Sequence, residues 1–453
     1  MNMLRNLGLS KIGNGKARVR VGHRLSLPTL AGVGLGLLAA MPAVAGPFTP
    51  YTLQTVIPVP TGPGNTVGGQ FKTYDIAFFD ANTQNYYLAD RSNASIDVFS
   101  AKTDSFVTRV NGYVGQLAVN GLSGPDGVVV VNDGTTHQLW AGDGNSTIKG
   151  YAISGTNAAP VFTPLPGTPI STVLSGSTPA LSARVDEMAY SPGAKTILAA
   201  NNTASPTPFA SIINVSATPS LGGQTVFDGT GTTPNAAGGI EQPAWNATTA
   251  SFWVSIVQIG ASASDPGGIS EVNPFTGAVI RTISFASLGI ASCGPTGLAA
   301  GPAGRLLVVC GNGATQTLII DPTKTGAAQL AASIPQTSGG DEGWYDPTTN
   351  RYFLADRNNV PNGSAPVLGI IDALSNTFLQ NVPTSAADHS VAVDPVSGQV
   401  FVAAGAAGFS AGSACANGCI LVFGVPEPGS LPLLLAGAGL LFGLGVRRHR
   451  ARA

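Results

Sequence analysis

Charge is scarce in this sequence of 453 residues, and histidine, cysteine and tryptophan are rarer still. Charged residues make up 10% of the chain, and His, Cys and Trp number four each. Typical soluble domains carry about 25% charged residues. By contrast, the chain has 59 Gly and 33 Pro, and 43% of its residues are hydrophobic. This hydrophobic content supports a buried core and excludes disorder, and turn-formers with few charges favour many short strands over a helical bundle.

A basic face is also missing from the central part of the chain. Residues 1–46 hold six Lys or Arg and no acid, and residues 447–453 hold four Arg. Between residues 47 and 424 only 12 bases face 22 acids, so the formal charge of −1 conceals an acidic body. Nucleic-acid binding needs a basic surface, so this class of function is excluded. An acidic body attracts cations instead.

The first 45 residues have the three parts of a secretory signal peptide. A basic stretch ends at Arg24, an apolar run extends from Leu30 to Met41, and small residues follow at Ala43-Val44-Ala45. The apolar run is short for a membrane-spanning helix, and a cleavage motif follows it at once. We therefore expect residues 1–45 to be a signal peptide and the mature chain to begin near Gly46.

The last 29 residues, 425–453, also have three parts. Pro426, Glu427 and Pro428 precede an apolar run, Leu431 to Val446, and an Arg-rich end. As a helix the run would rise about 24 Å, slightly less than the hydrocarbon core of a bilayer. The order of these parts resembles the PEP-CTERM sorting signal of Gram-negative bacteria. An ordinary C-terminal membrane anchor is the alternative.

The PEP-CTERM resemblance implies a route and a partner. It implies transient inner-membrane association through a transmembrane helix, and removal of the tail by an exosortase, a membrane-embedded cysteine protease. The product would then reside in the cell envelope or outside the cell. It also implies a link to exopolysaccharide or biofilm matrix, with a glycan or a protein as the ligand.

All four cysteines lie in the exported part of the chain, where disulfides are permitted. Four cysteines allow three connectivities, and the most local one pairs Cys293 with Cys310 and Cys415 with Cys419. A zinc site is the alternative. The chain offers neither a CxxC pair nor a nearby His cluster, so we expect disulfides.

The body between residues 46 and 424 is a repeat. Tyr74-Asp75-Ile-Ala-Phe-Phe-Asp80 and Gly340-Asp341-Glu-Gly-Trp-Tyr-Asp346 align, and each is followed by Leu-Ala-Asp-Arg. The frame extends to seven anchor positions, spaced by 46 to 60 residues: Asp75, Asp126, Asp186, Glu241, Pro295, Asp341 and Asp388. Residues three and four positions after every anchor are apolar, and turn-forming clusters follow them. This pattern predicts strand, turn and strand in every unit.

Units of this length with three or four strands are typical of propeller blades. The fold predicted is therefore an all-β, seven-bladed β-propeller, with an array of β-sandwiches as the alternative. The body resembles the YVTN/NHL-like propeller superfamily over residues 50–424. Asp90-Arg91 and Asp356-Arg357 are each expected to form an ion pair at a blade end, with anion binding as the alternative.

The anchors place carboxylates in one column of the repeat. The first strand of each propeller blade lines the central axis, so the anchors should form a ring at a channel mouth. The column and its neighbour contain nine candidate ligands: Asp75, Asp126, Asp186, Glu187, Glu241, Asp341, Glu342, Asp388 and His389. Oxygen ligands with a single His favour Ca²⁺ or Mg²⁺ as the cofactor. The alternative is that these carboxylates cap backbone N–H groups of neighbouring loops.

Two classes of function fit this pattern. A binding or scaffold propeller at the cell surface is the first, and it is not an enzyme. The second is suggested by Glu241-Gln-Pro-Ala-Trp245, which resembles the E-x-P-x-W segment of the SMP-30/gluconolactonase propellers, where this Glu binds a divalent metal. That resemblance implies a metal-dependent, lactonase-type hydrolase. No nucleophile-elbow, P-loop or dinucleotide motif is present, and no catalytic residue is assigned.

Overall fold

The computed structural model describes residues 48–174, 184–202, 207–311, 313–385, 388–410 and 412–426. The predicted signal peptide (1–45) and the sorting tail from Glu427 onward lie outside these residues. Among the described residues, no helix has the length and apolarity needed to cross a bilayer.

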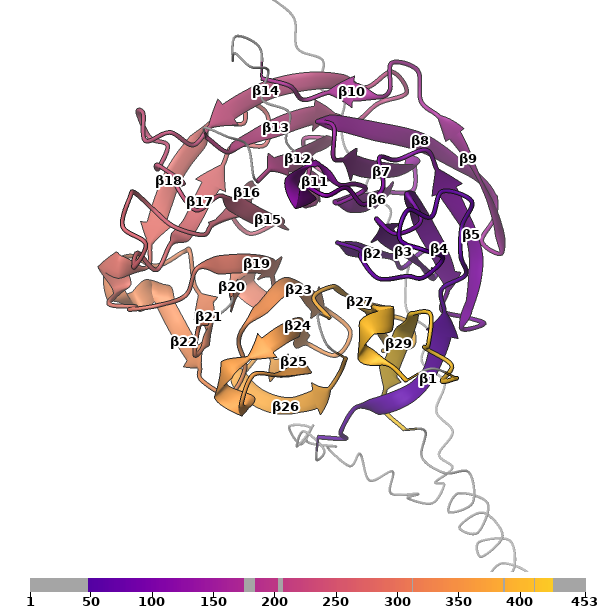
Figure 1. Ribbon diagram of the computed structural model, residues 1–453. Coiled ribbons are helices and arrows are strands. Elements are labelled where there is room, and N and C mark those ends of the chain that lie inside the picture. Colours follow the sequence, from indigo (N-terminus) through magenta and orange to yellow (C-terminus); the bar gives the residue numbers. More distant parts are fainter. Residues whose placement is uncertain are drawn as a thin grey trace, which may run out of the picture. The chain divides into compact units, whose positions relative to one another are not determined.

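Seven antiparallel sheets surround a common axis, which confirms the predicted seven-bladed propeller (Figure 1). Blade 1 contains β2 (Ala77–Asp80), β3 (Asn85–Asp90), β4 (Ser95–Ser100) and β5 (Ser105–Asn111). Blade 2 contains β6 (Val128–Asn132), β7 (His137–Asp143), β8 (Thr147–Thr156), β9 (Ala159–Pro164) and β10 (Ile170–Ser171). Blade 3 contains β11 (Met188–Ser191), β12 (Thr196–Asn201), β13 (Phe209–Asn214) and β14 (Ser220–Val226). Blade 4 contains β15 (Ile240–Asn246), β16 (Ser251–Ile256), β17 (Gly268–Val272) and β18 (Val279–Ser284). Blade 5 contains β19 (Pro295–Ala300), β20 (Leu306–Cys310), β21 (Thr317–Ile320) and β22 (Leu330–Ile334). Blade 6 contains β23 (Gly340–Asp346), β24 (Arg351–Asn359), β25 (Ala365–Asp372) and β26 (Thr377–Pro383). Blade 7 contains β27 (Val391–Val393), β28 (Val400–Ala404), β29 (Cys419–Gly424) and β1 (Thr52–Pro58). The described connections contain six short 3₁₀ helices: Asn120–Leu122, Ala286–Leu288, Pro302–Gly304, Gly326–Gln329, Val360–Asn362 and Ala406–Gly408.

The turn-forming clusters found in the sequence make the hairpins of the blades. Asp80 ends β2, and its carboxylate accepts hydrogen bonds from the Asn82 N–H (3.1 Å) and the Thr83 hydroxyl (2.8 Å). Gln84 then takes a left-handed conformation with φ of 55°, and Asn350 and Asn376 do so at the equivalent positions of other turns (53° and 56°). An Asx turn followed by one left-handed residue reverses the chain within four residues. The register of each hairpin therefore follows from local sequence.

The core lies between the blades. Val129 and Val131 of β6 pack in one cluster with Ile197 and Ala199 of β12, which belongs to the next blade. The other pairs of neighbouring blades share clusters of buried apolar residues in the same way, for example blades 5 and 6. Both faces of a blade are therefore covered by apolar neighbours, as in other stacked repeats. This explains why the body tolerates so few charged residues.

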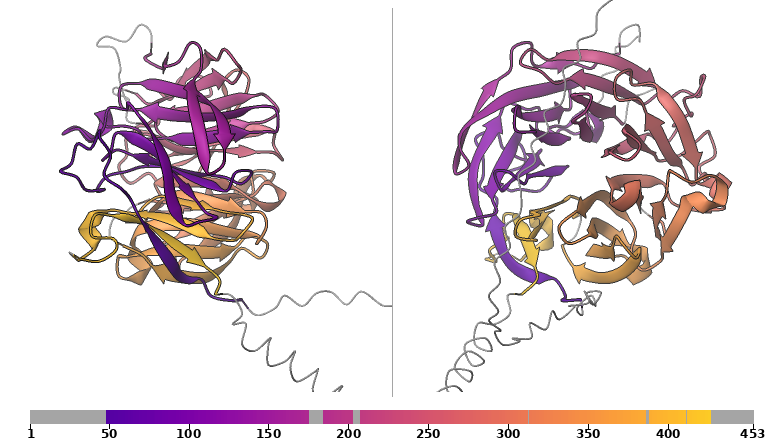
Figure 2. Two further views of the ribbon diagram at one scale, coloured as in Figure 1. Left: turned by 90° about the vertical axis from the view of Figure 1, so that its right-hand side faces the viewer. Right: turned by 180° about the vertical axis from the view of Figure 1, so that it is seen from behind.

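The two ends of the body meet in blade 7. β1 is the outermost strand of that blade and pairs with β29 in the antiparallel direction, from Thr52 opposite Gly424 to Pro58 opposite Cys419. In Figure 2 the indigo strand β1 lies beside the yellow strands of the C-terminal part. The ring is thus closed by hydrogen bonds between the first and the last strand. The sequence repeat did not reveal β1, because it precedes the first anchor.

Both predicted disulfides are present. Cys293 bonds to Cys310 at the end of β20, with their Cα atoms 4.5 Å apart, and Cys415 bonds to Cys419 at the start of β29, with Cα atoms 5.0 Å apart. The first ties the segment before β19 to its neighbouring strand, and the second fixes the loop that leads into β29.

The blades have two ends, which we name from their strand directions. The mouth face is the end at which the innermost strands β2, β6, β11, β15, β19, β23 and β27 begin. The exit face is the opposite end, where these strands turn into the next strand of the blade. β29 pairs with β28 from Cys419 at the mouth face (opposite Ala404) to Phe423 near the exit face (opposite Val400). Thr52 and Gly424, the two ends of the closed blade, therefore both lie at the exit face.

Candidate functional site

The anchor residues lie at or just before the start of each innermost strand, so they meet at the mouth face. Backbone hydrogen bonds fix three of them in the same way: the N–H groups of Asp75, Asp126 and Asp186 donate to carbonyls of the second strand of their own blade at 2.9, 3.1 and 2.8 Å. The innermost strands lie side by side around the axis, so the side chains of neighbouring anchors can share partners. The mouth is thus built by the repeat itself.

Arg91 neutralises the carboxylates of blades 1 and 2. Its guanidinium pairs with Asp75 and also donates from Nε to Asp126 Oδ1 at 2.7 Å. Burial raises the pKa of Asp126 to about 7, and Arg91 offsets only part of that effect. For Asp75 burial acts in the same direction, but Arg91, Arg184 and His389 together hold its pKa well below the usual range.

This placement corrects the expected pairing within Asp90-Arg91 and Asp356-Arg357. Arg91 reaches its anchors, while the Asp90 carboxylate accepts from the Asn93 N–H at 3.0 Å. Arg357 pairs with Asp341 at 3.1 Å. Arg91 follows the last residue of β3 and lies in the next turn. In β24 successive residues point to opposite sides, so Arg357 cannot easily meet Asp356. The arginines turn to the mouth instead.

Four other predicted ligands are held by hydrogen bonds or contacts near the axis. Glu342 accepts from the Val391 N–H (2.9 Å) and the Ser390 hydroxyl (3.0 Å), and burial raises its pKa well above the usual range. Asp388 accepts from the Ser385 N–H at 2.7 Å. His389 Nε2 lies 3.6 Å from Asp75 Oδ1. These contacts match the capping alternative for Glu342 and Asp388, while Asp341 and His389 contact charged partners.

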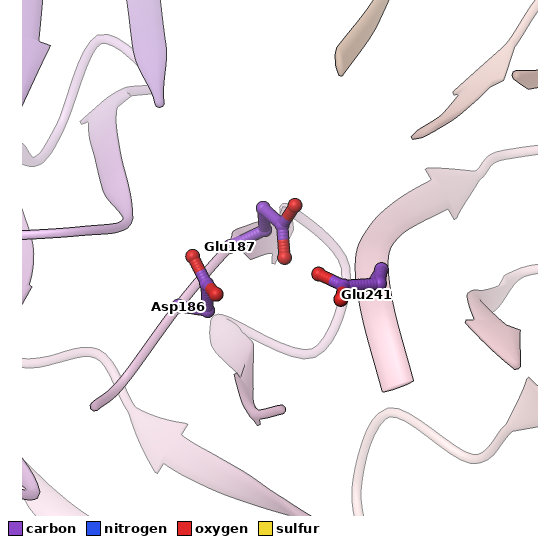
Figure 3. A group of neighbouring side chains, drawn as sticks. All are labelled: Asp186, Glu187 and Glu241. Carbon is purple, nitrogen blue, oxygen red and sulfur yellow. The ribbon is translucent and has the colours of Figure 1, made fainter. Parts of the chain in front are cut away.

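Three carboxylates form a cluster of their own: Asp186, Glu187 and Glu241 (Figure 3). One oxygen from each lies within 4.8 Å of the others. The Asp186 carboxylate pairs with Arg184 at 2.6 Å, and the Asn202 amide donates to Asp186 and, at 3.0 Å, to Glu241 Oε2. In Figure 3 the carboxylates of Glu187 and Glu241 point toward each other. We call these three residues the mouth cluster.

Glu187 is the residue of the mouth cluster that the protein itself does not satisfy. It is 2% exposed, and its Oε2 atom has no hydrogen-bond partner among the residues that the structure describes. Glu342 occupies the same repeat position in blade 6, and Gln242 does so in blade 4. The Gln242 Oε1 atom accepts from the backbone N–H groups of Leu298 and Gly343 at 2.7 and 3.0 Å. Buried carboxylates without partners are costly, so such a group points to a missing ligand.

The electrostatics of the mouth cluster agree with this reading. Burial, then the neighbouring carboxylates, raise the pKa of Glu187 well above its usual range, and burial also raises that of Asp186 despite Arg184. Burial and Asp341 raise the pKa of Glu241 to about 7. Three carboxylates beside one guanidinium leave two negative charges when all are ionised. A divalent cation would neutralise them.

Below the mouth, a cavity of about 350 Å³ follows the axis. Glu187, Gln242 and Glu342 lie at its mouth end, and Tyr190, Trp245 and Trp344 lie toward the exit face. Its other lining residues are mostly small or aliphatic. Through Glu187, the mouth cluster therefore borders a pocket large enough for a small ligand.

Sequence reasoning missed Arg184 and Asn202 as parts of the mouth. Asn202 had a usable signal: it stands 16 residues after its anchor Asp186, as Arg91 does after Asp75 and Arg357 after Asp341. The side chain of a polar residue at this position contacts the anchor carboxylate of its own blade. Arg184 had no such signal, because it lies before the innermost strand of blade 3.

Comparisons with known proteins concern the tail and the fold. Residues 424–450 match the family model described as the PEP-CTERM protein-sorting motif. This is a PEP-CTERM sorting tail. The match confirms the resemblance drawn from the tail, and it begins at the last residue of β29. A search of curated proteins gave no significant match.

Solved structures share the propeller at low sequence identity. A chain from the mitotic checkpoint complex is 12% identical with a TM-score of 0.51, and covers 89% of this chain and 100% of its own length. A chain of Kuenenia stuttgartiensis hydrazine synthase is 12% identical with a TM-score of 0.54, covering 80% and 99%. The WD40 β-propeller domain of Doa1 is 12% identical with a TM-score of 0.50, covering 84% and 99%. At this identity the likeness shows the fold alone.

Proposed function

We propose that this protein is an exported, exosortase-processed β-propeller that acts at the cell surface by binding, and that its mouth cluster holds a divalent cation. The PEP-CTERM tail supports the route, together with the signal peptide predicted for residues 1–45. The proposed order is export, brief retention in the inner membrane by the apolar run of the tail, and removal of the tail. A YVTN/NHL-like kinship agrees with a binding role.

The buried Oε2 atom of Glu187, which has no partner among the described residues, carries the proposal of a cation. All candidate ligand atoms are carboxylate oxygens, the donors preferred by Ca²⁺ and Mg²⁺. Separations of up to 4.8 Å between them suit Ca²⁺, whose oxygen ligands lie at about 2.4 Å, better than the smaller Mg²⁺. Asp186, Glu187 and Glu241 would hold the ion, with Arg184 and Asn202 orienting Asp186.

Thermal unfolding of the purified protein with calcium or with a chelator tests the cation. We expect calcium to raise the Tm of the wild type, because an ion that binds only the folded state stabilises it. Glu187→Gln should abolish this increase. The matched control is Glu342→Gln, which changes the same repeat position in blade 6, where backbone and hydroxyl donors already occupy the carboxylate. The control should keep its response to calcium, and a response retained by Glu187→Gln would contradict the site.

Lactonase-type hydrolysis is the second candidate. It is favoured by the position of Glu241, the first residue of the E-x-P-x-W resemblance, inside the mouth cluster. In this case the ion would polarise a lactone carbonyl at the border of the axial cavity. Turnover of a simple γ-lactone with calcium or manganese, lost in Glu241→Gln, would establish hydrolysis. The binding role predicts that no turnover depends on Glu241.

A further inference from the structure

Five of the exposed large apolar side chains lie at the exit face, the end of the propeller from which the sorting tail departs, while Leu117, Val119 and Leu122 lie in one loop at the mouth face. Three of them occupy the tips of blade turns: Phe275 is 69% exposed, Leu374 61% and Val396 66%. Two more flank the closed end of blade 7, where Leu53 is 50% and Val425 40% exposed. We call these five residues the exit tips.

The turns present these side chains in one fixed way. The N–H groups of Phe275, Leu374 and Val396 donate to the side-chain oxygens of Asn273, Asp372 and Asp394 at 2.9, 3.0 and 2.8 Å. Each apolar residue is thus the third residue of an Asx turn, held outward by its own backbone. The corresponding residues of other Asx turns at this face are polar, for example Asn82, Thr323 and Thr348. The apolar tips belong to blades 4, 6 and 7.

The length of the tail brings this face to a membrane. β29 ends at Gly424 and the apolar run begins at Leu431, so six residues separate them. Six extended residues span at most about 20 Å. While the run is held in a bilayer, Gly424, at the exit face, must therefore lie within that distance of the lipid surface. The mouth cluster lies at the opposite end of the blades.

We infer that the exit tips form a lipid-contacting surface, which docks the propeller on the bilayer with its mouth pointing outward before the tail is removed. This rests on the proposed function, because it requires the tail to be held in a membrane. Apolar side chains on turns can enter the interfacial region of a bilayer while the charged residues of the same face stay in water. The exit-face turns carry both signs of charge, for example Lys102 and Asp104, so the attraction is apolar rather than electrostatic.

Single thiol labels on the full chain test this orientation. All four native cysteines are in disulfides, so Val396→Cys or Leu374→Cys introduces the one free thiol for an environment-sensitive fluorophore. Val119→Cys is the matched control: Val119 is 59% exposed in a loop at the mouth face. Each protein is reconstituted into vesicles of phosphatidylethanolamine and phosphatidylglycerol that contain a headgroup-level nitroxide quencher, and flotation measures retention.

The outcomes separate the inference from the proposed function. Flotation, with labels at Val396 and Leu374 quenched at least about twofold more than the label at Val119, supports the docking surface. Flotation with equal quenching at both faces, or stronger quenching at Val119, overturns it and leaves the sorting route intact. A chain that does not float refutes retention by the tail, and the docking surface falls with it. The three positions are exposed, so each substitution should leave folding unchanged.

Discussion

In the absence of calcium, the mouth cluster should make the protein less stable as pH rises toward neutrality. Glu241 shows the size of this effect, because burial and Asp341 raise its pKa from about 4.5 to about 7. A raised carboxyl pKa means that the folded state binds the proton more tightly than the unfolded chain does. Stability from this group is therefore complete below about pH 4.5 and is lost as pH rises through 7.

The magnitude follows from the shift. Each pKa unit corresponds to about 1.4 kcal/mol, so a shift from 4.5 to about 7 costs about 3 kcal/mol of folding free energy when the proton is lost. Glu241→Gln removes the titrating group but keeps an amide near Asn202. Between pH 4.5 and 8, we expect the free energy of unfolding of the variant to fall by about 3 kcal/mol less than that of the wild type.

Urea unfolding at several pH values between 4.5 and 8, followed by tryptophan fluorescence in chelator, measures this difference. Asp228→Asn is the control, because Asp228 lies in an exposed turn and its pKa is lowered, outside the window. The control should follow the wild-type curve. Parallel stability curves for the wild type and Glu241→Gln would refute the reasoning. Calcium should flatten the wild-type curve, since the ion stabilises the ionised cluster.

Three further predictions concern the scaffold. Arg91→Leu should lower the free energy of unfolding by about 3 kcal/mol or more, measured in urea at pH 7, because it removes the guanidinium that pairs with both buried carboxylates, Asp75 and Asp126; a loss under 1 kcal/mol would show that these ion pairs are not needed. Replacing both Cys293 and Cys310 by Ala should cost about 3 kcal/mol in the same assay, since their bond closes a loop with a sequence separation of 17; an equal loss in reduced wild type is the check. Deleting β1 should expose the edge of β29 and cause association visible by light scattering, and a monomeric, fully stable deletion would contradict closure by β1.

The fold could be predicted because every unit of the repeat carries the same local pattern of strand and turn residues. Apolar positions and turn-forming clusters recur in each unit, so the strand, turn and strand that follow each anchor could be predicted from the repeat alone. β1 could not be found in this way, because the other three strands of its blade come from the opposite end of the sequence. The extra strand β9 of blade 2 was missed for a similar reason: it belongs to one unit only.

The sequence could predict that carboxylates line the mouth, but not which of them are neutralised by arginines. Anchor spacing places Asp75, Asp186 and Glu241 at one end of the ring. Which of them is neutralised depends on arginines that contact it from another strand or the neighbouring blade, as Arg91 does for Asp126. A formal count of acids therefore overstated the free charge. The unpartnered state of Glu187 is a property of the packed mouth alone.

The closure of blade 7 also decides how the body responds to force. A pull on the tail is applied at Gly424, along the axis of β29, and this strand is hydrogen-bonded on both sides, to β28 and to β1. Hydrogen bonds between antiparallel strands run perpendicular to the strands, so such a load shears many bonds at once rather than opening them one by one. A tethered propeller of this design should withstand extraction forces that would unzip one ending on an edge strand.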